Sequence, residues 1–256
     1  MQNKNLEYFI EKNLQFRPRF FAYIRSQEGL LFTKYAQFIK SKSLDFGCGD
    51  GFFAETVFGR KKIDIGLDVP SSRMQIAKRN KVYKQLVTYN GSKIPLRPSS
   101  FKTVVSNCVF EHIPHIEKSV QEIYSVLRPG GYLLTSVMCS PWSTNLSGAK
   151  WGGLAYVRWF NRVQEHNALY SKKQWISLFR KIGFSIEVSE DYLFKRTSQK
   201  TELFHYLSVP SLLLYKLIGK WTLGIKPNQK EVNEIRDIIL NDKQHPSACF
   251  FVLKKK

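Results

Sequence analysis

Three glycines in one short segment are the first residues that suggest chemistry. Residues 44–51 read Leu-Asp-Phe-Gly-Cys-Gly-Asp-Gly, with Gly47, Gly49 and Gly51 between two apolar stretches. Glycines let the backbone approach a ligand closely, and the N–H groups that open a following helix are unpaired. The spacing is G-x-G-x-G, and Phe52 stands where the dinucleotide motif G-x-G-x-x-G has its third glycine. The turn therefore predicts a ligand site that does not favour a pyrophosphate cofactor.

Asp68 is the second chemical candidate, because it lies near the end of the next expected strand, Ile63–Val69. A carboxylate at that position can accept two hydrogen bonds from the hydroxyls of a ribose. The alternative is that Asp68 is a helix N-cap beside Pro70 and Ser71. The glycine turn and the carboxylate together favour a ligand that carries a ribose.

Alternating strands and helices position these residues between about 41 and 140. We expect strands at 42–47, 63–69, 86–89, 101–107 and 132–138, and helices at 51–58, from Ser72 onward and at 116–127. Pro129-Gly130-Gly131 is expected to end the last helix and turn the chain into the fifth strand. Ser-x-x-Gln patterns at Ser72 and Ser171 predict capping boxes. Strands and helices at such short spacing indicate right-handed βαβ units and a mostly parallel sheet.

Beyond residue 140 the pattern changes. Residues 141–170 are aromatic and irregular, and a helix after Ser171 leads into an expected strand at 184–190. A last strand is expected at 248–253. We therefore divide the sequence into an N-terminal helical extension at 1–40 and a domain at 41–256, with insertions at about 141–170 and 192–245.

The sequence resembles class I S-adenosylmethionine-dependent methyltransferases in five segments that occur in the family's order: LDFGCGDG, IDIGLDV, YNGSKIPL, FKTVVSNCVFEHIPH and LRPGGYLL. It is most similar to the small-molecule branch that includes ubiquinone/menaquinone-type methyltransferases. The resemblance covers about residues 41–140. It implies an α/β, Rossmann-like, mostly parallel seven-stranded sheet with helices on both faces, an antiparallel C-terminal strand, and helical and aromatic insertions. It implies S-adenosyl-L-methionine as the cofactor.

The same resemblance assigns cofactor contacts to the first two strands. Asp68 should bind the ribose hydroxyls. The methionine part should be held by the residues at the end of the first strand: Asp45, Gly47, Cys48, Gly49 and Gly51.

Three further positions follow from the resemblance. Asn90 lies where the family often has an aspartate that accepts from the adenine amino group, and an Asn carbonyl oxygen can accept the same bond. The alternative is that Asn90 is only a turn residue in Asn-Gly. Gly91 should offer a backbone N–H to adenine, and Asn107 should lie beside the cofactor at the end of the fourth strand.

Two histidines are candidates for a catalytic base. A sulfonium methyl is already electrophilic, so transfer depends on positioning, and a hydroxyl or acidic-carbon acceptor also needs a base. His112 follows the fourth strand, where ligands bind in open α/β sheets, and His166 lies in the first insertion. The alternative for His112 is a loop residue that only packs or forms hydrogen bonds. His112 and His115 resemble a metal pair, but no further ligands have suitable spacing, so we expect no metal site.

The insertions carry the features that bear on the acceptor. Trp142, Trp151, Tyr156 and Trp159 stand among basic residues, which suits an acceptor with apolar and anionic parts or, equally, the core of a lid. Residues 207–223 predict an amphipathic helix from Pro210 to Trp221, with lysines beside its apolar side. That pattern fits a helix at an anionic membrane surface, a helix packed over the domain, or a dimer contact.

Composition sets the remaining limits. The net charge is +20 and the pI is about 9.8, so polyanions are expected partners; the alternative is that the charge provides solubility without a specific partner. Four scattered cysteines suit a reducing cytoplasm, and the charged N-terminus predicts no signal peptide. No apolar stretch is long enough to span a bilayer, so we expect a cytoplasmic protein, with peripheral binding at the inner face of a membrane as an alternative.

These observations leave three hypotheses about function. The first is methyl transfer to a small-molecule, sugar or lipid-linked acceptor in cell-envelope biosynthesis, which a loose likeness of residues 166–182 to envelope-pathway methyltransferases favours. The second is methylation of RNA or another nucleic acid, suggested by the charge. It is disfavoured because Asn107-Cys108-Val109-Phe110 replaces the Asn/Asp-Pro-Pro-aromatic turn of base methyltransferases. The third is a cofactor-binding module that performs no catalysis.

Overall fold

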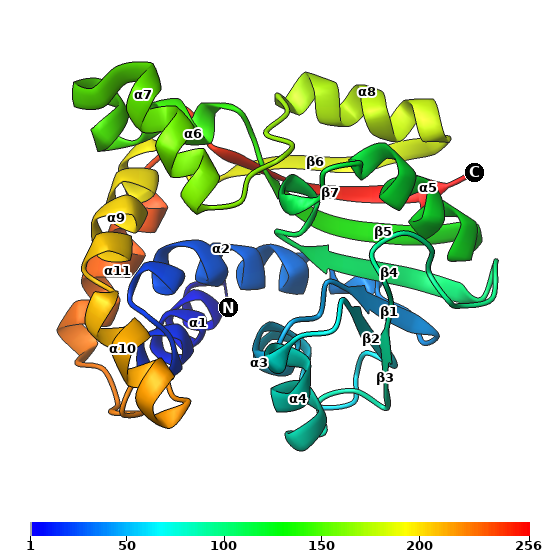
Figure 1. Cartoon of the computed structure of the whole chain (residues 1–256), viewed down its shortest axis with the longest axis horizontal. Coiled ribbons are helices and arrows are strands. Elements are labelled where there is room, and N and C mark those ends of the chain that lie inside the picture. Colours follow the sequence, from blue (N-terminus) through cyan, green and yellow to red (C-terminus); the bar gives the residue numbers. More distant parts are fainter. Residues whose placement is uncertain (1) are drawn as a thin grey trace. The chain divides into compact units, whose positions relative to one another are not determined.

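Two groups of segments form separate compact units in the computed structural model, which describes residues 2–256 (Figure 1). Unit 1 combines Met1–Leu31, Pro141–Phe160 and Asp191–Ala248. Unit 2 combines Phe32–Ser140, Asn161–Glu190 and Cys249–Lys256. Residues that are distant in the sequence therefore share one packed unit in both cases.

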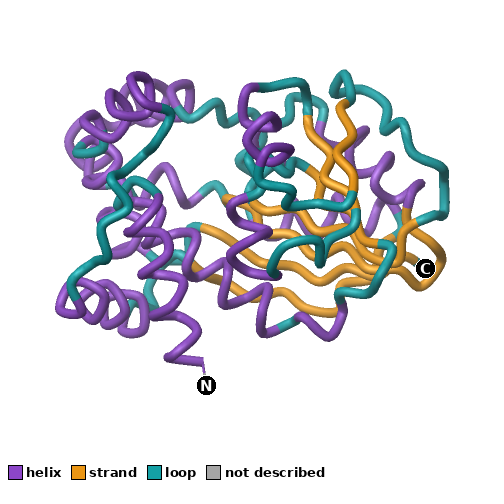
Figure 2. The backbone as a smooth tube through the Cα atoms, turned by 90° about the horizontal axis from the view of Figure 1, so that it is seen from below, coloured by secondary structure: helices purple, strands orange, loops and turns teal. Residues whose placement is uncertain are grey.

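Unit 2 contains a seven-stranded sheet with the strand order β3-β2-β1-β4-β5-β7-β6. The strands are β1 (Ser43–Phe46), β2 (Ile65–Asp68), β3 (Gln85–Thr88), β4 (Phe101–Asn107), β5 (Leu127–Met138), β6 (Phe184–Tyr192) and β7 (Ala248–Lys255). Strands β1 to β5 pair in parallel, and the C-terminal pair is antiparallel. Figure 2 shows the strands as one twisted layer. The sequence prediction of a mostly parallel Rossmann-like sheet is confirmed.

Helices cover both faces of this sheet. They are α3 (Phe52–Phe58), α4 (Ser72–Arg79), α5 (Ile116–Val126) and α8 (Lys172–Ile182), with short 3₁₀ turns at η1 (Ala36–Phe38) and η2 (Phe110–His112). Neighbouring strand residues point to opposite faces. Phe251 of β7 packs on Phe179 of α8 with ring centroids 5.3 Å apart, whereas Phe250 packs on Phe32 at 4.9 Å. The two aromatic contacts therefore mark the two covered faces.

Strand register brings the predicted site residues to one edge of the sheet. Asp45 of β1 pairs with Gly66 of β2 and with Val105 of β4. Two residues further along each strand, the chain reaches Gly47, Asp68 and Asn107. These three positions are therefore neighbours at the carboxyl edge, where parallel sheets bind ligands.

Unit 1 is helical. Its helices are α1 (Gln2–Phe16), α2 (Phe20–Lys34, whose last turn belongs to unit 2), α6 (Pro141–Asn145), α7 (Ser147–Val163, which ends in unit 2), α9 (Lys195–Tyr206), α10 (Val209–Ile218) and α11 (Gln229–Asn241). Leu6 and Ile10 of α1 pack with Val232 and Ile235 of α11 in a buried apolar cluster. The N-terminal segment and the second insertion thus share a core.

Several local expectations differ from the structure. Residues 141–163 are helical rather than irregular, with a kink at Gly153, where φ is 55° and ψ is −143°. Gly148, Gly152 and Gly153 lower the helix propensity, which hides the helix in the sequence. Pro129-Gly130-Gly131 lies inside β5 instead of before it. Positions 101 and 103 of β4 pair with positions 127 and 132 of β5, so the extra residues form a bulge-like irregularity.

The two predicted capping boxes have different outcomes. At α8, Ser171 accepts a hydrogen bond from the Gln174 N–H, and the Gln174 side chain accepts from the Ser171 N–H at 2.8 Å, which confirms the box. At α4 the prediction is wrong, because the helix begins at Ser72 and its N-cap is Ser71, which forms no side-chain capping bond. The side chain of Ser72 lies outside the described part of the structure.

Candidate functional site

The glycine turn after β1 has left-handed backbone at all three glycines, with φ of 78° at Gly47, 53° at Gly49 and 76° at Gly51. A side chain at Gly47 would place its Cβ 2.4 Å from Cγ2 of Val109, so close packing requires glycine there. Apart from its chain neighbours, no described atom lies within 4 Å of the Cβ position at Gly49. The backbone of Gly49 is therefore open to a ligand on this side.

Asp68 is held in place at the end of β2 by two backbone groups. Its Oδ2 accepts from the Gly49 N–H at 2.7 Å, and its Oδ1 accepts from the Val69 N–H at 2.7 Å. Burial raises the pKa of this carboxyl, and the bonds from Gly49 and Val69 oppose that shift. Each oxygen keeps a second lone pair, so the carboxylate can still accept from two hydroxyls. The alternative of a helix N-cap is wrong, because Ser71 occupies the N-cap of α4.

Asp45 is almost fully buried beneath the glycine turn and accepts a hydrogen bond from the Tyr83 hydroxyl at 2.6 Å. Burial raises the pKa of Asp45 to about 7, the Tyr83 bond lowers it, and the charge of Asp68 raises it further. Burial also raises the pKa of the Cys48 thiol, with the two aspartates adding to the shift. An ionised Asp45 is therefore costly unless a cation approaches it.

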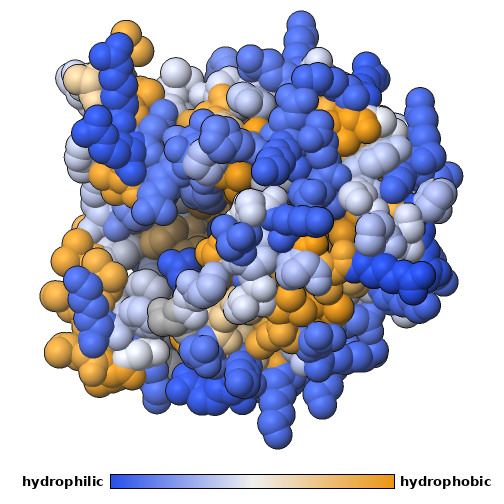
Figure 3. Space-filling view, turned by 45° about the vertical axis from the view of Figure 1, so that its right-hand side comes forward, coloured by the Kyte–Doolittle hydropathy of each residue, from blue (hydrophilic) through white to orange (hydrophobic). Residues whose placement is uncertain are grey.

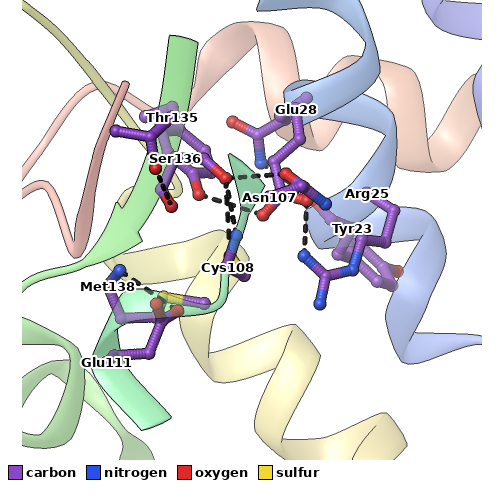
Figure 4. A network of polar contacts seen from close by, with 11 residues as sticks. Tyr23, Arg25, Glu28, Asn107, Cys108, Glu111, Thr135, Ser136 and Met138 are labelled. Atoms are coloured by element: carbon purple, nitrogen blue, oxygen red, sulfur yellow. Dashed lines mark hydrogen bonds and ion pairs between the residues drawn. The ribbon is translucent and has the colours of Figure 1, made fainter. Parts of the chain in front are cut away.

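Asn107 ends β4 with its side chain oriented by the neighbouring strand. The Ser136 hydroxyl donates to Asn107 Oδ1 at 2.6 Å and accepts from the Cys108 N–H at 3.0 Å, as Figure 4 shows. Ser136 is fully buried and pairs with Asn107 in the register of β4 and β5. The sequence analysis missed both Ser136 and Tyr83. Only the strand register and the packing of β3 bring these two hydroxyls to the site.

Asn90 and Gly91 form a turn that follows β3. Asn90 Oδ1 accepts from both the N–H and the hydroxyl of Ser92, at 3.1 and 2.7 Å. Both lone pairs of this oxygen are thus engaged within the turn, as the turn-residue interpretation expected. Gly91 has a φ of 82°, and Cγ1 of Val69 lies 3.9 Å from its Cβ position. The turn therefore lies beside the end of β2, and the adenine contacts of Asn90 and Gly91 stay predictions.

The two candidate histidines, which are far apart in the sequence, lie together. The ring centroids of His112 and His166 are 5.1 Å apart. His112 is exposed, and its Nδ1 lies 3.3 Å from the Glu165 carbonyl oxygen. His166 Nδ1 is buried with no hydrogen-bond partner among the described atoms. Burial lowers the pKa of His166 to about 3, and the charge of His112 lowers it further, so His166 is neutral near pH 7.

Asn167 fixes the backbone around this pair. Its side chain donates to the His112 carbonyl oxygen at 2.8 Å, and its N–H donates to the Glu111 carbonyl oxygen at 2.7 Å. Glu111 itself is buried and accepts weakly from the Met138 N–H at 3.4 Å. The segment that carries His166 is therefore attached to the turn that carries His112.

Between residues 2 and 256, no group of three or more His, Cys, Asp or Glu side chains is arranged to hold a metal ion. Within the same part of the chain, every helix is too short or too polar to cross a bilayer.

Comparisons with known proteins define the class. A solved S-adenosylmethionine-dependent methyltransferase of Thermotoga maritima, described as a possible histamine N-methyltransferase, superposes with a TM-score of 0.58 at 18% identity, covering 100% of both chains. At that identity the likeness concerns the fold, which is that of class I methyltransferases. The family model described as a methyltransferase domain matches residues 4–188. The chain belongs to this methyltransferase family, and the resemblance found in the sequence is confirmed.

Relatives by sequence include ubiquinone biosynthesis O-methyltransferases and malonyl-[acyl-carrier protein] O-methyltransferases. The mitochondrial protein of Mus musculus is 30% identical over 105 residues, which cover 38% of this chain and 28% of that protein. The protein of Bartonella bacilliformis is 24% identical over 173 residues, 62% of this chain and 67% of its own length. The chain thus spans less than a third of the first relative and about two thirds of the second.

The described residues fit the cofactor of this family. Asp68 has two free acceptor positions for a ribose diol, the backbone of Gly49 is open on one side, and Asp45 is a buried carboxylate whose ionisation a nearby cation would favour. S-adenosylmethionine carries both a ribose diol and a sulfonium cation. The same residues therefore suit its two distinctive groups.

Proposed function

We propose that this protein transfers the methyl group of S-adenosylmethionine to a hydroxyl of a small-molecule or lipid-linked acceptor that has apolar and anionic parts. The observation that carries the proposal is the carboxylate of Asp68, which two backbone N–H groups anchor at 2.7 Å beside the open backbone of Gly49. Several sequence relatives are named O-methyltransferases of ubiquinone biosynthesis, which supports a hydroxyl acceptor, and others are named malonyl-[acyl-carrier protein] O-methyltransferases, which supports an oxygen acceptor in general.

Each cofactor residue has a physical role in this proposal. Asp68 accepts hydrogen bonds from the ribose hydroxyls while its two oxygens keep their bonds to the Gly49 and Val69 N–H groups. The charge of Asp68 acts on Asp45, and an ionised Asp45 balances the positive charge of the sulfonium. Gly47, Gly49 and Gly51 give the left-handed turn that exposes backbone to the ligand. Asn107, oriented by Ser136, presents an amide at the adjoining strand end.

The two histidines have different roles in this proposal: His112 is the base, and His166 is its neutral neighbour. The lowered pKa of His166 makes it a weak proton acceptor, because a general base works best with a pKa near the operating pH. His112 is exposed and is therefore the better candidate to take the proton from the acceptor hydroxyl. S-adenosylmethionine, held by Asp68 and the glycine turn, would supply an electrophilic methyl group for the acceptor oxygen and would keep the electron pair of the carbon–sulfur bond on sulfur. His112 would take the proton that the hydroxyl releases.

The kind of acceptor is proposed from the residues of α7. Trp151 and Trp159 of α7 are exposed aromatic residues, and Lys150, Arg158 and Arg162 lie in the same helix. Apolar surface with adjacent cations suits an acceptor that has apolar and anionic parts, such as a lipid-linked precursor in cell-envelope biosynthesis. Work on such a precursor would take place at the inner face of a membrane.

The experiment combines binding with transfer. Purified protein should bind S-adenosylmethionine in a calorimetric titration and pass a labelled methyl group to an organic-extractable fraction of a cell extract. His112→Asn should keep the binding and slow the transfer. Label in RNA would contradict the acceptor class, and binding without transfer to any fraction would contradict catalysis. Absence of heat and of a thermal shift would refute the proposal as a whole.

A further inference from the structure

Helix α10 and the segment after it expose several large apolar side chains. Leu217 is 81% exposed, and Leu223 and Ile225 are each 72% exposed. Leu213 and Ile218 are also more than half exposed, and none of the side chains of α10 is buried. We call these five residues the α10 tip: Leu213, Leu217, Ile218, Leu223 and Ile225. Several large apolar side chains exposed within one short segment indicate a binding surface.

The tip is a helix followed by a return segment, and not the continuous helix to Trp221 that the sequence predicted. Helix α10 ends at Ile218, and Gly219 turns the chain with a φ of 70°. Trp221 then folds back and stacks on Tyr215, with ring centroids 4.2 Å apart and planes at 11°. Leu217 and Ile218 before the turn therefore lie close in sequence to Leu223 and Ile225 after it.

The return segment is anchored to the end of α1 in the same unit. The Gln15 side chain donates to the Gly224 carbonyl oxygen at 2.9 Å, and the Thr222 hydroxyl donates to the Gln15 carbonyl oxygen. These bonds tie down the backbone, while the leucine and isoleucine side chains face solvent. The exposed apolar surface is thus part of an ordered element.

Charge identifies the partner. Lys216, Lys220 and Lys226 are exposed around the tip, and the sequence has no acidic residue between Glu202 and Glu231. Apolar side chains bordered by lysines match the interface of a membrane with anionic lipids. A second copy of this chain would bring the same lysines against themselves across a two-fold contact, which like charges disfavour. Figure 3 shows apolar side chains gathered at the lower left of the molecule with hydrophilic side chains among them.

We propose that the α10 tip inserts into the apolar layer of an anionic membrane surface, while Lys216, Lys220 and Lys226 contact the lipid head groups. This deepens the proposed function, since a lipid-borne acceptor would be met at that surface. The binding itself needs neither cofactor nor acceptor. Its failure can therefore be told apart from a failure of the methyltransferase proposal.

The test uses the full-length protein and vesicles of phosphatidylcholine alone or with about a third phosphatidylglycerol. Wild-type protein should float with the anionic vesicles, and added salt should weaken this binding. Leu217→Ser and Leu223→Ser should each lower the partition coefficient by about 10- to 100-fold. Leu203→Ser in α9 is the control, because Leu203 is 47% exposed in the same unit and lies outside both the tip and α7. It should bind as the wild type does.

Two additional measurements keep the test decisive. Thermal unfolding and the calorimetric titration with S-adenosylmethionine should be unchanged in the tip variants, which shows that they fold. Lysine-to-glutamine changes at 216, 220 and 226 should remove the preference for anionic vesicles without exposing new apolar surface. Equal flotation of wild type and tip variants would overturn the proposal. A dimer in solution that the tip variants dissociate, without vesicle binding by the wild type, would identify a second copy as the partner and would also overturn it.

Discussion

Replacing Asp68 with alanine should remove most of the affinity for S-adenosylmethionine. Both carboxylate oxygens already accept one backbone bond at 2.7 Å, so each has one lone pair left for a ribose hydroxyl. A hydrogen bond to a charged acceptor contributes roughly 1.5–3 kcal/mol, and water partly replaces the two lost bonds. The net loss should be about 2–4 kcal/mol, which corresponds to a Kd weaker by about 30- to 700-fold.

The same substitution also removes the acceptor of the Gly49 N–H, so an indirect effect on the turn must be separated. A cofactor analogue that lacks one ribose hydroxyl provides the separation. Against the wild type it should bind about tenfold or more weakly than the parent compound, because one charged hydrogen bond is missing. Against Asp68→Ala the two ligands should bind alike, since no carboxylate distinguishes them.

The assay is isothermal titration with S-adenosylmethionine, repeated with the analogue. Asp64→Asn is the control, because Asp64 precedes β2 at the opposite end and accepts from Ser43 and Lys84 instead of facing the glycine turn. It should bind cofactor as the wild type does. An unchanged Kd for Asp68→Ala, or an equal loss for Asp64→Asn, would refute the assignment of the ribose contact.

Three further results are expected from the same site. Gly49→Ala should lower the free energy of unfolding by only about 1–2 kcal/mol, because alanine is strained in left-handed backbone, yet it should abolish most cofactor binding. Gly47→Ala should unfold at a clearly lower temperature, because its methyl group would lie 2.4 Å from Val109. Since burial raises the pKa of Asp45 to about 7 and a cationic ligand favours the ionised form, cofactor affinity should fall as the pH drops below 7, and Asp45→Asn should flatten that dependence in titrations at pH 6 and 8. Because the pKa of His166 is lowered to about 3, the unfolded chain binds a proton between pH 3 and 6.5 that the folded chain does not. The neutral His166 therefore contributes to stability above about pH 6.5, and this contribution is lost by up to about 1.4 kcal/mol per pH unit as the pH falls toward 3. The unfolding temperature of His166→Asn should decrease less between pH 6.5 and 5 than that of the wild type.

The sheet and its cofactor edge could be predicted because their signals are local. The strand 101–107 has the same bounds in the sequence analysis and in the structure, and most neighbouring elements agree within two residues. Glycines at 47, 49 and 51, whose spacing predicted a turn with backbone open to a ligand, have left-handed backbone in the structure. A parallel sheet then brings the strand ends together without further information.

The remaining parts depend on contacts that no local pattern reveals. Tyr83 reaches Asp45 across 38 positions of sequence, and Ser136 reaches Asn107 across 29. His112 and His166 were separate candidates until the bonds of Asn167 placed their segments together. At Asn90 the structure shows two local bonds to Ser92, whereas the adenine contact that the family resemblance implies stays a prediction.

The division into two units makes the cofactor and membrane proposals separable. Every predicted cofactor residue lies in unit 2, and the α10 tip lies in unit 1. Substitutions that share no partner usually add in free energy. The double variant Asp68→Ala with Leu217→Ser should therefore match Asp68→Ala in the cofactor titration and match Leu217→Ser in vesicle flotation. If Leu217→Ser alone weakened cofactor binding in the absence of vesicles, its side chain would serve the site itself, and the exposed leucines would no longer argue for a membrane partner.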